Sequence, residues 1–121
     1  MKISLIIAVY NSEKYIRRCL TSIMSPELPS EEVEIVIVDD ASTDNSVDIV
    51  RECVATRDNI ILLCKKENEG TFLSRIDGMK AASGDYIGFV DGDDWISPQM
   101  LWPIYRGGTT ERIYCRGWNI K

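Results

Sequence analysis

Four short apolar runs, separated by segments with helical periodicity, constrain the fold of this 121-residue chain more than any other feature. The runs occupy residues 3–10, 33–38, 60–64 and 86–90. Continuous apolar runs of this length are typical of strands buried on both faces. Strands that alternate with helices form a parallel sheet with helices packed on both sides. We therefore predict an α/β fold with a mostly parallel sheet.

The segments between the runs predict three helices. The first follows a cap at Asn11-Ser12, and its apolar face is made of Tyr15, Ile16, Cys19, Leu20, Ile23 and Met24. The second is capped by Ser42 or Thr43, and its buried stripe is expected to be Val47, Val50 and Val54. The third covers residues 71–82, and the side chains expected to face the sheet are Phe72, Ile76 and Met79.

Composition excludes several function classes. The chain has 19 acidic and 14 basic residues and a net charge of −5, so general attraction to nucleic acid is not expected. It contains no His, which excludes His-based catalytic triads and His-containing zinc sites. No CxxC unit occurs, and we interpret the four cysteines as buried thiols in a reducing compartment: Cys19, Cys53, Cys64 and Cys115. Because no apolar run approaches the about 18 residues of a membrane helix, we predict a soluble cytoplasmic protein.

Acidic residues cluster after two of the predicted strands. Asp39-Asp40 follows the second strand, and Asp91-Gly92-Asp93-Asp94 follows the fourth. Acidic residues often serve as turn formers and helix caps, but ligands of open α/β sheets bind at the edge where the strands end. Five carboxylates at one edge therefore favour a functional site. Oxygen ligands without His or Cys favour Mg²⁺ or Mn²⁺, and such an ion would let an acidic chain bind a diphosphate.

Other nucleotide and metal motifs do not fit. The stretch from Asp91 has Ile96 and Trp102 where an EF-hand requires Gly and Glu. Neither GxGxxG nor a Walker A sequence occurs, so a dinucleotide fingerprint and a P-loop are excluded.

A series of motifs resembles one enzyme family. Ala8-Val9-Tyr10-Asn11 follows the first strand, residues 38–44 (VDDASTD) follow the second, and Asn68-Glu69-Gly70 precedes the third helix. Gly84-Asp85-Tyr86-Ile87 then leads to the acidic cluster at residues 91–94. Over residues 1–98 this order resembles the nucleotide-binding half of a family 2 glycosyltransferase with the Rossmann-like GT-A fold. The resemblance implies a metal-dependent, inverting transfer of sugar from a nucleotide-diphosphate donor, typically a UDP-sugar, to an acceptor hydroxyl.

The resemblance also implies roles for individual residues. Those expected to contact the nucleotide are Ala8, Val9, Tyr10, Glu13, Asp39, Asp40, Arg75, Asp91 and Gly92. Asp40, together with Asp39, would accept hydrogen bonds from the base, typically uracil. Asp93 would bind Mn²⁺ or Mg²⁺ directly, and Asp91 would contact the ribose or a metal-bound water. The family usually has Pro where Ala8 stands, and the alternative interpretation of Arg75 is a solvated helix charge.

The last part of the chain departs from the family. Residues 101–121 show neither helical nor strand periodicity, and Glu111 is the only acid after Asp94. In the family the carboxylate that deprotonates the acceptor lies well downstream, so we expect the catalytic base to be absent from this chain. We interpret residues 1–98 as a nucleotide-sugar-binding half-domain and residues 99–121 as an atypical basic tail. Truncation, a shifted reading frame and genuine divergence are alternative origins of that tail. The sheet would then be incomplete at its C-terminal side, and the tail or a second copy of the chain would cover it.

Two other functions remain open. A non-catalytic remnant would bind the nucleotide sugar without transferring it. A phospho-receiver signalling domain has a similar length and an acidic metal pocket, but it carries acids after its first and third strands. Here those strands end at Tyr10-Asn11 and Cys64-Lys65. Saccharide or lipid-linked acceptors are common in the family, which implies a role in cell-wall or polysaccharide biosynthesis, in the cytoplasm or at the inner face of the membrane.

Overall fold

The four apolar runs form strands, as predicted. The computed structural model describes residues 2–23, 33–55, 59–91, 113–115 and 118–120. Its strands are β1 (Ile3–Val9), β2 (Val33–Asp39), β3 (Ile60–Cys64), β4 (Tyr86–Asp91), β5 (Ile113–Cys115) and β6 (Trp118–Ile120). The helices that alternate with the first four strands are α1 (Ile16–Ile23), α2 (Ser46–Val54) and α3 (Thr71–Ala81).

The strands form one sheet in the order β3-β2-β1-β4-β6-β5. The β1–β2, β1–β4 and β2–β3 pairs are parallel, which confirms the predicted parallel arrangement. β6 runs antiparallel to β4, with Gly88 opposite Ile120, and β5 pairs with β6. The sequence pattern of this last segment does not predict these strands. β5 and β6 are three residues each, too short to produce a recognisable period.

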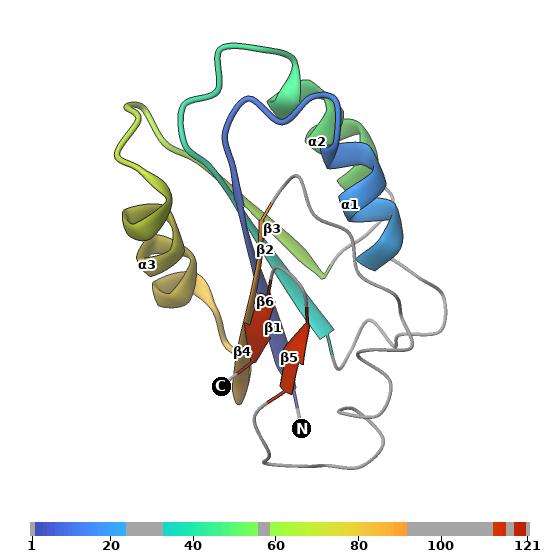
Figure 1. Ribbon diagram of the computed structural model, residues 1–121, viewed down its shortest axis with the longest axis vertical. Helices are drawn as coiled ribbons and strands as arrows, with labels where there is room; N and C mark the ends of the chain where they lie inside the picture. The colour runs from blue at the N-terminus through green and yellow to red at the C-terminus, as the bar shows by residue number, and fades with distance from the viewer. Residues whose placement is uncertain (1, 24–32, 56–58, 92–112, 116–117, 121) are drawn as a thin grey trace.

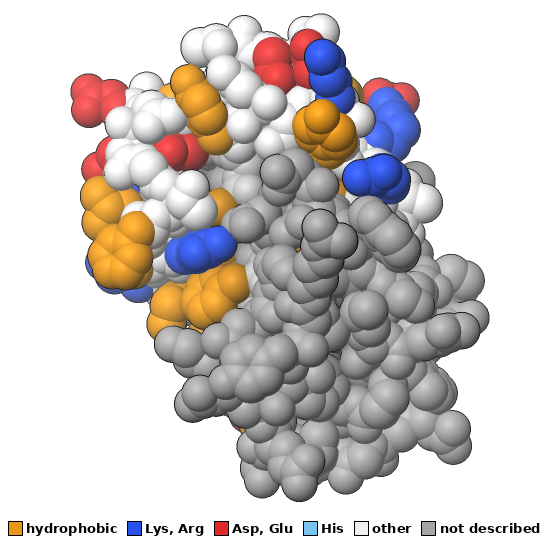
Figure 2. Space-filling view, viewed as in Figure 1, with side chains coloured by type: hydrophobic (Ala, Val, Ile, Leu, Met, Phe, Trp, Pro, Cys, Tyr) orange, Lys and Arg blue, Asp and Glu red, His pale blue; other side chains and the backbone are white. Residues whose placement is uncertain are grey.

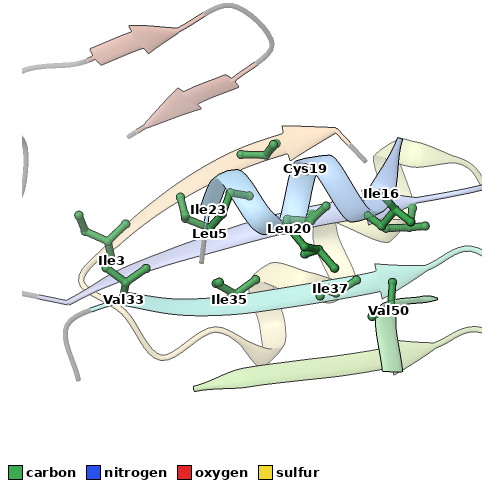
Figure 3. Close-up of a cluster of buried hydrophobic side chains, with 13 residues drawn as sticks. Ile3, Leu5, Ile16, Cys19, Leu20, Ile23, Val33, Ile35, Ile37 and Val50 are labelled. Atoms are coloured by element: carbon green, nitrogen blue, oxygen red, sulfur yellow. The ribbon is translucent and has the colours of Figure 1, made fainter. Parts of the chain in front are cut away.

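Helices cover both faces of the sheet (Figure 1). α1 and α2 lie side by side on one face, where their apolar residues pack on alternate residues of β1 and β2. Figure 3 shows this cluster, in which Ile16, Leu20 and Ile23 of α1 are fully buried. The face predicted for α1 is thus largely confirmed, whereas Tyr15 is 46% exposed and Met24 lies outside the described residues. No helix within the described ranges is long and apolar enough to cross a membrane.

The predicted inward face of α3 is wrong at Phe72 and Met79, whereas Ile76 is half-buried. Phe72 is 73% exposed and Met79 is 40% exposed, whereas the buried residues of the helix are Ser74 and Gly78. A Cβ atom on Gly78 would lie 2.5 Å from Ile6 Cγ2, so the helix backbone rests almost directly on β1. Small residues therefore face the bulky strands, and larger apolar side chains lie on the outside, where Figure 2 shows hydrophobic side chains on the α3 side.

Burial of the cysteines follows the prediction only in part. Cys19 is buried in the core and Cys53 is half-buried, but Cys64 at the end of β3 is exposed. The side chain of Cys115 lies outside the described residues. On α2, Val50 is buried as expected, and Val54 packs against the same core while partly exposed. Val47 is half-buried.

The buried carboxylate of Glu34 connects strands at the edge of the sheet where β1, β2 and β4 begin. Ser4 Oγ donates to Glu34 Oε2 at 2.7 Å, and the Ser83 N–H donates to the same oxygen at 2.9 Å. The Ser83 hydroxyl donates to Glu34 Oε1 at 3.0 Å, and Lys2 Nζ lies 3.9 Å from that oxygen. Burial alone raises the pKa of Glu34, but the hydrogen bonds from Ser4 and Ser83 and the charge of Lys2 together lower it below its ordinary value.

The lowered pKa of Glu34 predicts a loss of stability in acid. Its ionised form is favoured in the folded state, so its contribution is fully present above the ordinary Glu pKa of about 4.3 and disappears as the pH falls through the lower folded value. Glu34→Gln is expected to be less stable than the natural chain at pH 7, and the difference should shrink as the pH falls from about 5 to 3. Urea unfolding over this pH range measures it. A difference that stays constant with pH would contradict the prediction.

Candidate functional site at the carboxyl edge of the sheet

The strand register brings the two acidic clusters to either side of the end of β1. Val9 of β1 pairs with Asp39 of β2, and Ala8 pairs with Asp91 of β4. The Asp40 N–H also donates to the carbonyl of Val9 at 2.8 Å. Five of the predicted site residues (Ala8, Val9, Asp39, Asp40 and Asp91) are thus neighbours along the backbone at one edge of the sheet.

Asp39 closes the turn that leaves β2. The side chain is 2% exposed, and both of its carboxylate oxygens accept hydrogen bonds from Ser42. The Ser42 hydroxyl donates to Oδ1 at 2.6 Å and the Ser42 N–H donates to Oδ2 at 3.0 Å. Between them Ala41 has a φ of 62°, a left-handed conformation that a residue with a Cβ adopts only when its surroundings fix it.

Asp40 holds the beginning of α3. It is 3% exposed, and its two oxygens accept hydrogen bonds from the N–H groups of Glu69 and Gly70, at 2.9 and 2.8 Å. Gly70 has a φ of 95° and ψ of 160°, a conformation that essentially only glycine adopts, and this orients both N–H groups toward one carboxylate. A carboxylate is stabilised by free N–H groups at a helix N-terminus. This partner lies 30 residues away along the chain, so no local sequence signal reveals it.

Reciprocal hydrogen bonds fasten the loop between β1 and α1 to the loop between β2 and α2. The Thr43 N–H donates to Asn11 Oδ1 at 2.8 Å, and the Asn11 N–H donates to Ser42 Oγ at 3.0 Å. The Asn45 N–H donates to Glu13 Oε2, and the Glu13 N–H donates to Asp44 Oδ2, each at 3.2 Å. The predicted site residue Glu13 is therefore engaged between the two loops.

Two further predicted site residues, Tyr10 and Arg75, have side chains that are not fully buried. Tyr10 is 48% exposed, whereas the neighbouring Val9 is 1% exposed and its carbonyl accepts the Asp40 N–H, so Tyr10 is the more accessible of these two residues. Arg75 is half-buried on α3, with its guanidinium carbon 5.8 Å from the centre of the Phe89 ring on β4, a cation–π geometry. Arg75 is therefore placed between α3 and the sheet rather than fully solvated.

Sequence reasoning missed Lys65. It follows β3 directly, its side chain is 11% exposed, and its ammonium group pairs with Glu69 and with Asp77, the latter at 2.7 Å. The two hydrogen-bonded carboxylates raise the pKa of Lys65 above its ordinary value, so the side chain is fully charged at neutral pH. The spacing of Lys65 and Glu69 as i,i+4 was a signal, but the segment does not read as a helix and the pairing rule applies to helices.

The predicted metal ligands lie largely outside the described residues. Gly92 and Asp93 fall outside, as does the side chain of Asp91, whose backbone ends β4. Among the residues that the structure describes, no three His, Cys, Asp or Glu side chains are grouped to hold a metal. Each carboxylate oxygen of Asp39 and Asp40 already accepts one hydrogen bond, whereas Asp91, Asp93 and Asp94 supply further carboxylates in the sequence, oxygen ligands that suit Mg²⁺ or Mn²⁺.

Two curated relatives match most of the chain. It is 43% identical over 102 residues to a poly(ribitol-phosphate) beta-glucosyltransferase of Bacillus spizizenii, covering 84% of this chain and 16% of the relative. It is 41% identical over 105 residues to the glycosyltransferase GlyA of Streptococcus pneumoniae, covering 87% of this chain and 15% of the relative.

Two solved structures share the fold. Staphylococcus aureus TarS 1-349 in complex with UDP-GlcNAc superimposes with a TM-score of 0.79 at 36% identity, over 88% of this chain and 30% of that one. The mannosyltransferase PcManGT of Pyrobaculum calidifontis, in complex with GDP-Man and Mn²⁺, gives a TM-score of 0.73 at 26% identity, over 78% and 28% of the two chains. The chain thus spans less than a third of each of these four proteins.

The likeness to TarS confirms the GT-A fold expected from the motif series. The family model described as Glycosyl transferase family 2 matches residues 4–107, which is most of the sequence. The phospho-receiver alternative is therefore wrong, and this chain belongs to glycosyl transferase family 2.

Proposed function

We propose that this chain binds the nucleotide-diphosphate part of a sugar donor, typically a UDP-sugar, at the carboxyl edge of its sheet. The observation that carries the proposal is the meeting of Asp39-Asp40, Ala8-Val9 and Asp91 around the end of β1. TarS, which shares this fold, has been solved with UDP-GlcNAc. In the proposed complex the base lies along residues 8–10 with Tyr10 beside it, while Asp91 and Gly92 lie toward the ribose and diphosphate.

Asp40 is the proposed acceptor of a hydrogen bond from the base. Each of its oxygens already accepts one backbone N–H and retains a second lone pair for a ligand. Asp39 accepts two hydrogen bonds from Ser42 within its own turn, whereas the partners of Asp40 come from the loop before α3, and the role proposed for Asp39 is to hold the turn beside Asp40. Arg75, a cation on the helix that Asp40 caps, is proposed to face the negative charge of the nucleotide.

Asp93, with Asp91, is the proposed binding site for Mn²⁺ or Mg²⁺. PcManGT, with a related fold, has been solved with Mn²⁺. When bound, such an ion neutralises the diphosphate as negative charge develops on the leaving nucleotide. The reaction proposed for the family lineage of this chain is transfer with inversion to a saccharide, polyol-phosphate or lipid-linked hydroxyl. The alternative proposal is a chain that binds the donor without transferring sugar.

Calorimetric titration with UDP tests the proposed site. The chain is expected to bind UDP about tenfold more tightly with Mn²⁺ than without it, the effect of one additional charge-assisted contact. Asp93→Asn is expected to lose this enhancement, whereas the exposed residue Asp48 on α2 provides a control of equal charge change, Asp48→Asn, that should keep it. No UDP binding at millimolar concentration would overturn the proposal.

A transfer assay distinguishes an active glycosyltransferase from a chain that only binds the donor. An enzyme releases UDP from UDP-GlcNAc when an acceptor is added, and Asp93→Asn stops the release. A binding remnant gives the same titration but no release.

A further inference from the structure

We infer that Lys65 is a positioning residue for nucleotide recognition, because it fixes the loop whose N–H groups orient Asp40. This inference rests on the proposed function, in which Asp40 accepts a hydrogen bond from the base. The loop in question, residues 65–70, connects β3 to α3 and is called the β3–α3 loop below.

The β3–α3 loop is held at both of its ends. At its start, the Lys65 N–H donates to the carbonyl of Asp39 at 2.9 Å. At its end, the N–H groups of Glu69 and Gly70 donate to the carboxylate of Asp40. The loop is therefore bonded to Asp39, which ends β2, and to Asp40, which follows it. A change in the shape of the loop would alter the direction from which Asp40 is held.

The Lys65 side chain closes the loop on itself and onto α3. Its ammonium group lies between Glu69 in the loop and Asp77 two turns into the helix, 2.7 Å from Asp77 Oδ2. The lysine is 11% exposed, while its two partners are 48% and 40% exposed. A largely shielded charge bonded to two carboxylates is held more firmly than an exposed pair. Without it, the loop would lose the ion pairs that join Glu69 to α3 through Asp77, and its shape would be held less firmly.

The consequence reaches the base through Asp40. Lys65 binds the side chain of Glu69, and the backbone N–H of Glu69 donates to one oxygen of Asp40. The N–H of the adjacent Gly70 donates to the other oxygen. Lys65 thus acts on the ligand only through this loop. Uracil presents an N–H at position 3, whereas cytosine presents a bare nitrogen there, so a well-oriented carboxylate favours UDP over CDP. The ratio of the two affinities therefore reports how Asp40 is oriented.

The test measures the dissociation constants of UDP and CDP for the natural chain, for Lys65→Met and for Lys66→Met. Lys66 is the adjacent exposed lysine and has no ion pair with the described residues, so its substitution is a control of equal charge change. Lys65→Met is expected to reduce the preference for UDP over CDP about fivefold, the size of coupling expected between neighbouring groups. Lys66→Met should leave it unchanged, and Lys65→Arg should restore most of it. A variant that is merely less stable lowers both affinities by the same folded fraction, so the ratio does not move.

The outcomes separate the inference from the proposed function. If the natural chain shows no preference for UDP, base recognition by Asp40 is wrong, and the inference is overturned with it. If the natural chain prefers UDP but Lys65→Met keeps the ratio, or Lys66→Met reduces it equally, only the positioning role is overturned. Should Lys65→Met not fold, Asp77→Asn removes one of the two ion pairs, and it is expected to reduce the ratio by a smaller factor. An unchanged ratio in that variant overturns the inference.

Discussion

Asp40→Asn is expected to weaken UDP binding about 10- to 100-fold, since hydrogen bonds to a charged group contribute about 1.5–3 kcal/mol. The side chain keeps its size, but an amide has one oxygen where the carboxylate has two. It can accept from Glu69 or from Gly70, and its own NH₂ group then faces the other N–H. The same change removes an anion from the N-terminus of α3, and we expect the free energy of unfolding to fall by about 1–2 kcal/mol.

Calorimetric titration of UDP well below the melting temperature of the variant measures the first effect, and urea unfolding measures the second. Glu67→Gln provides the control, because Glu67 is exposed in the same loop and makes no hydrogen bond or ion pair with described residues. That variant should bind UDP and unfold like the natural chain. An Asp40→Asn variant with natural UDP affinity and reduced stability would leave Asp40 as a cap of α3 and remove it from the nucleotide site.

Gly84→Ala is expected to lower the free energy of unfolding by about 3 kcal/mol, because the added methyl group meets atoms that cannot move. Its Cβ would lie 2.5 Å from Ser4 Oγ, 2.8 Å from the Ser4 backbone nitrogen and 3.0 Å from the Lys2 carbonyl oxygen. Two of these are main-chain atoms, one in β1 and one in Lys2 just before it. The third belongs to the hydroxyl that receives the Gly84 N–H and donates to Glu34, so the clash also disrupts the buried carboxylate network.

Gly78→Ala is the informative comparison for Gly84→Ala. Its Cβ would also approach an atom to 2.5 Å, but that atom and the next nearest belong to the side chains of Ile6 and Val38, so relief requires a shift of these side chains or of α3 and not of a strand backbone. In addition, Ala is favoured over Gly inside a helix by about 1 kcal/mol. We therefore expect the loss of stability to be clearly smaller than for Gly84→Ala in urea unfolding. The reverse order would show that β1 yields more easily than the packing between α3 and the sheet.

The central part of the fold could be predicted from the sequence because its signals are local. Each of the four parallel strands is a mainly apolar run, and the stripe Ile16, Cys19, Leu20 and Ile23 marks the buried face of α1. The face predicted for α3 is wrong because Phe72 and Met79, two of its large apolar residues, are exposed. The buried residues between the helix and the sheet are the small residues Ser74 and Gly78, because the helix lies close to β1 and β2. The periodicity of a single segment does not predict the distance between a helix and the sheet on which it packs.

The candidate site was predictable in its location and unpredictable in its bonding. Acidic residues after β2 and β4 had to meet at one edge once the sheet was parallel, and the register brings them there. That Asp40 caps α3, and that Lys65 joins Glu69 to Asp77, depend on how the β3–α3 loop folds back over the end of β2. Contacts between residues some 30 positions apart follow from tertiary structure, not from local propensity.

The fastening of the β1–α1 loop to the β2–α2 loop has a thermodynamic consequence for ligand binding. Loops that close around a ligand lose conformational entropy when it binds, and this loss is subtracted from the affinity. Here Asn11, at a φ of 47°, and Ala41, at 62°, are already held in left-handed conformations by the hydrogen bonds around Ser42 and Thr43. The entropy of these loops is therefore lost on folding. A ligand at this edge would bind loops that are already ordered. Less of its favourable binding free energy would therefore be offset by lost conformational entropy of the chain.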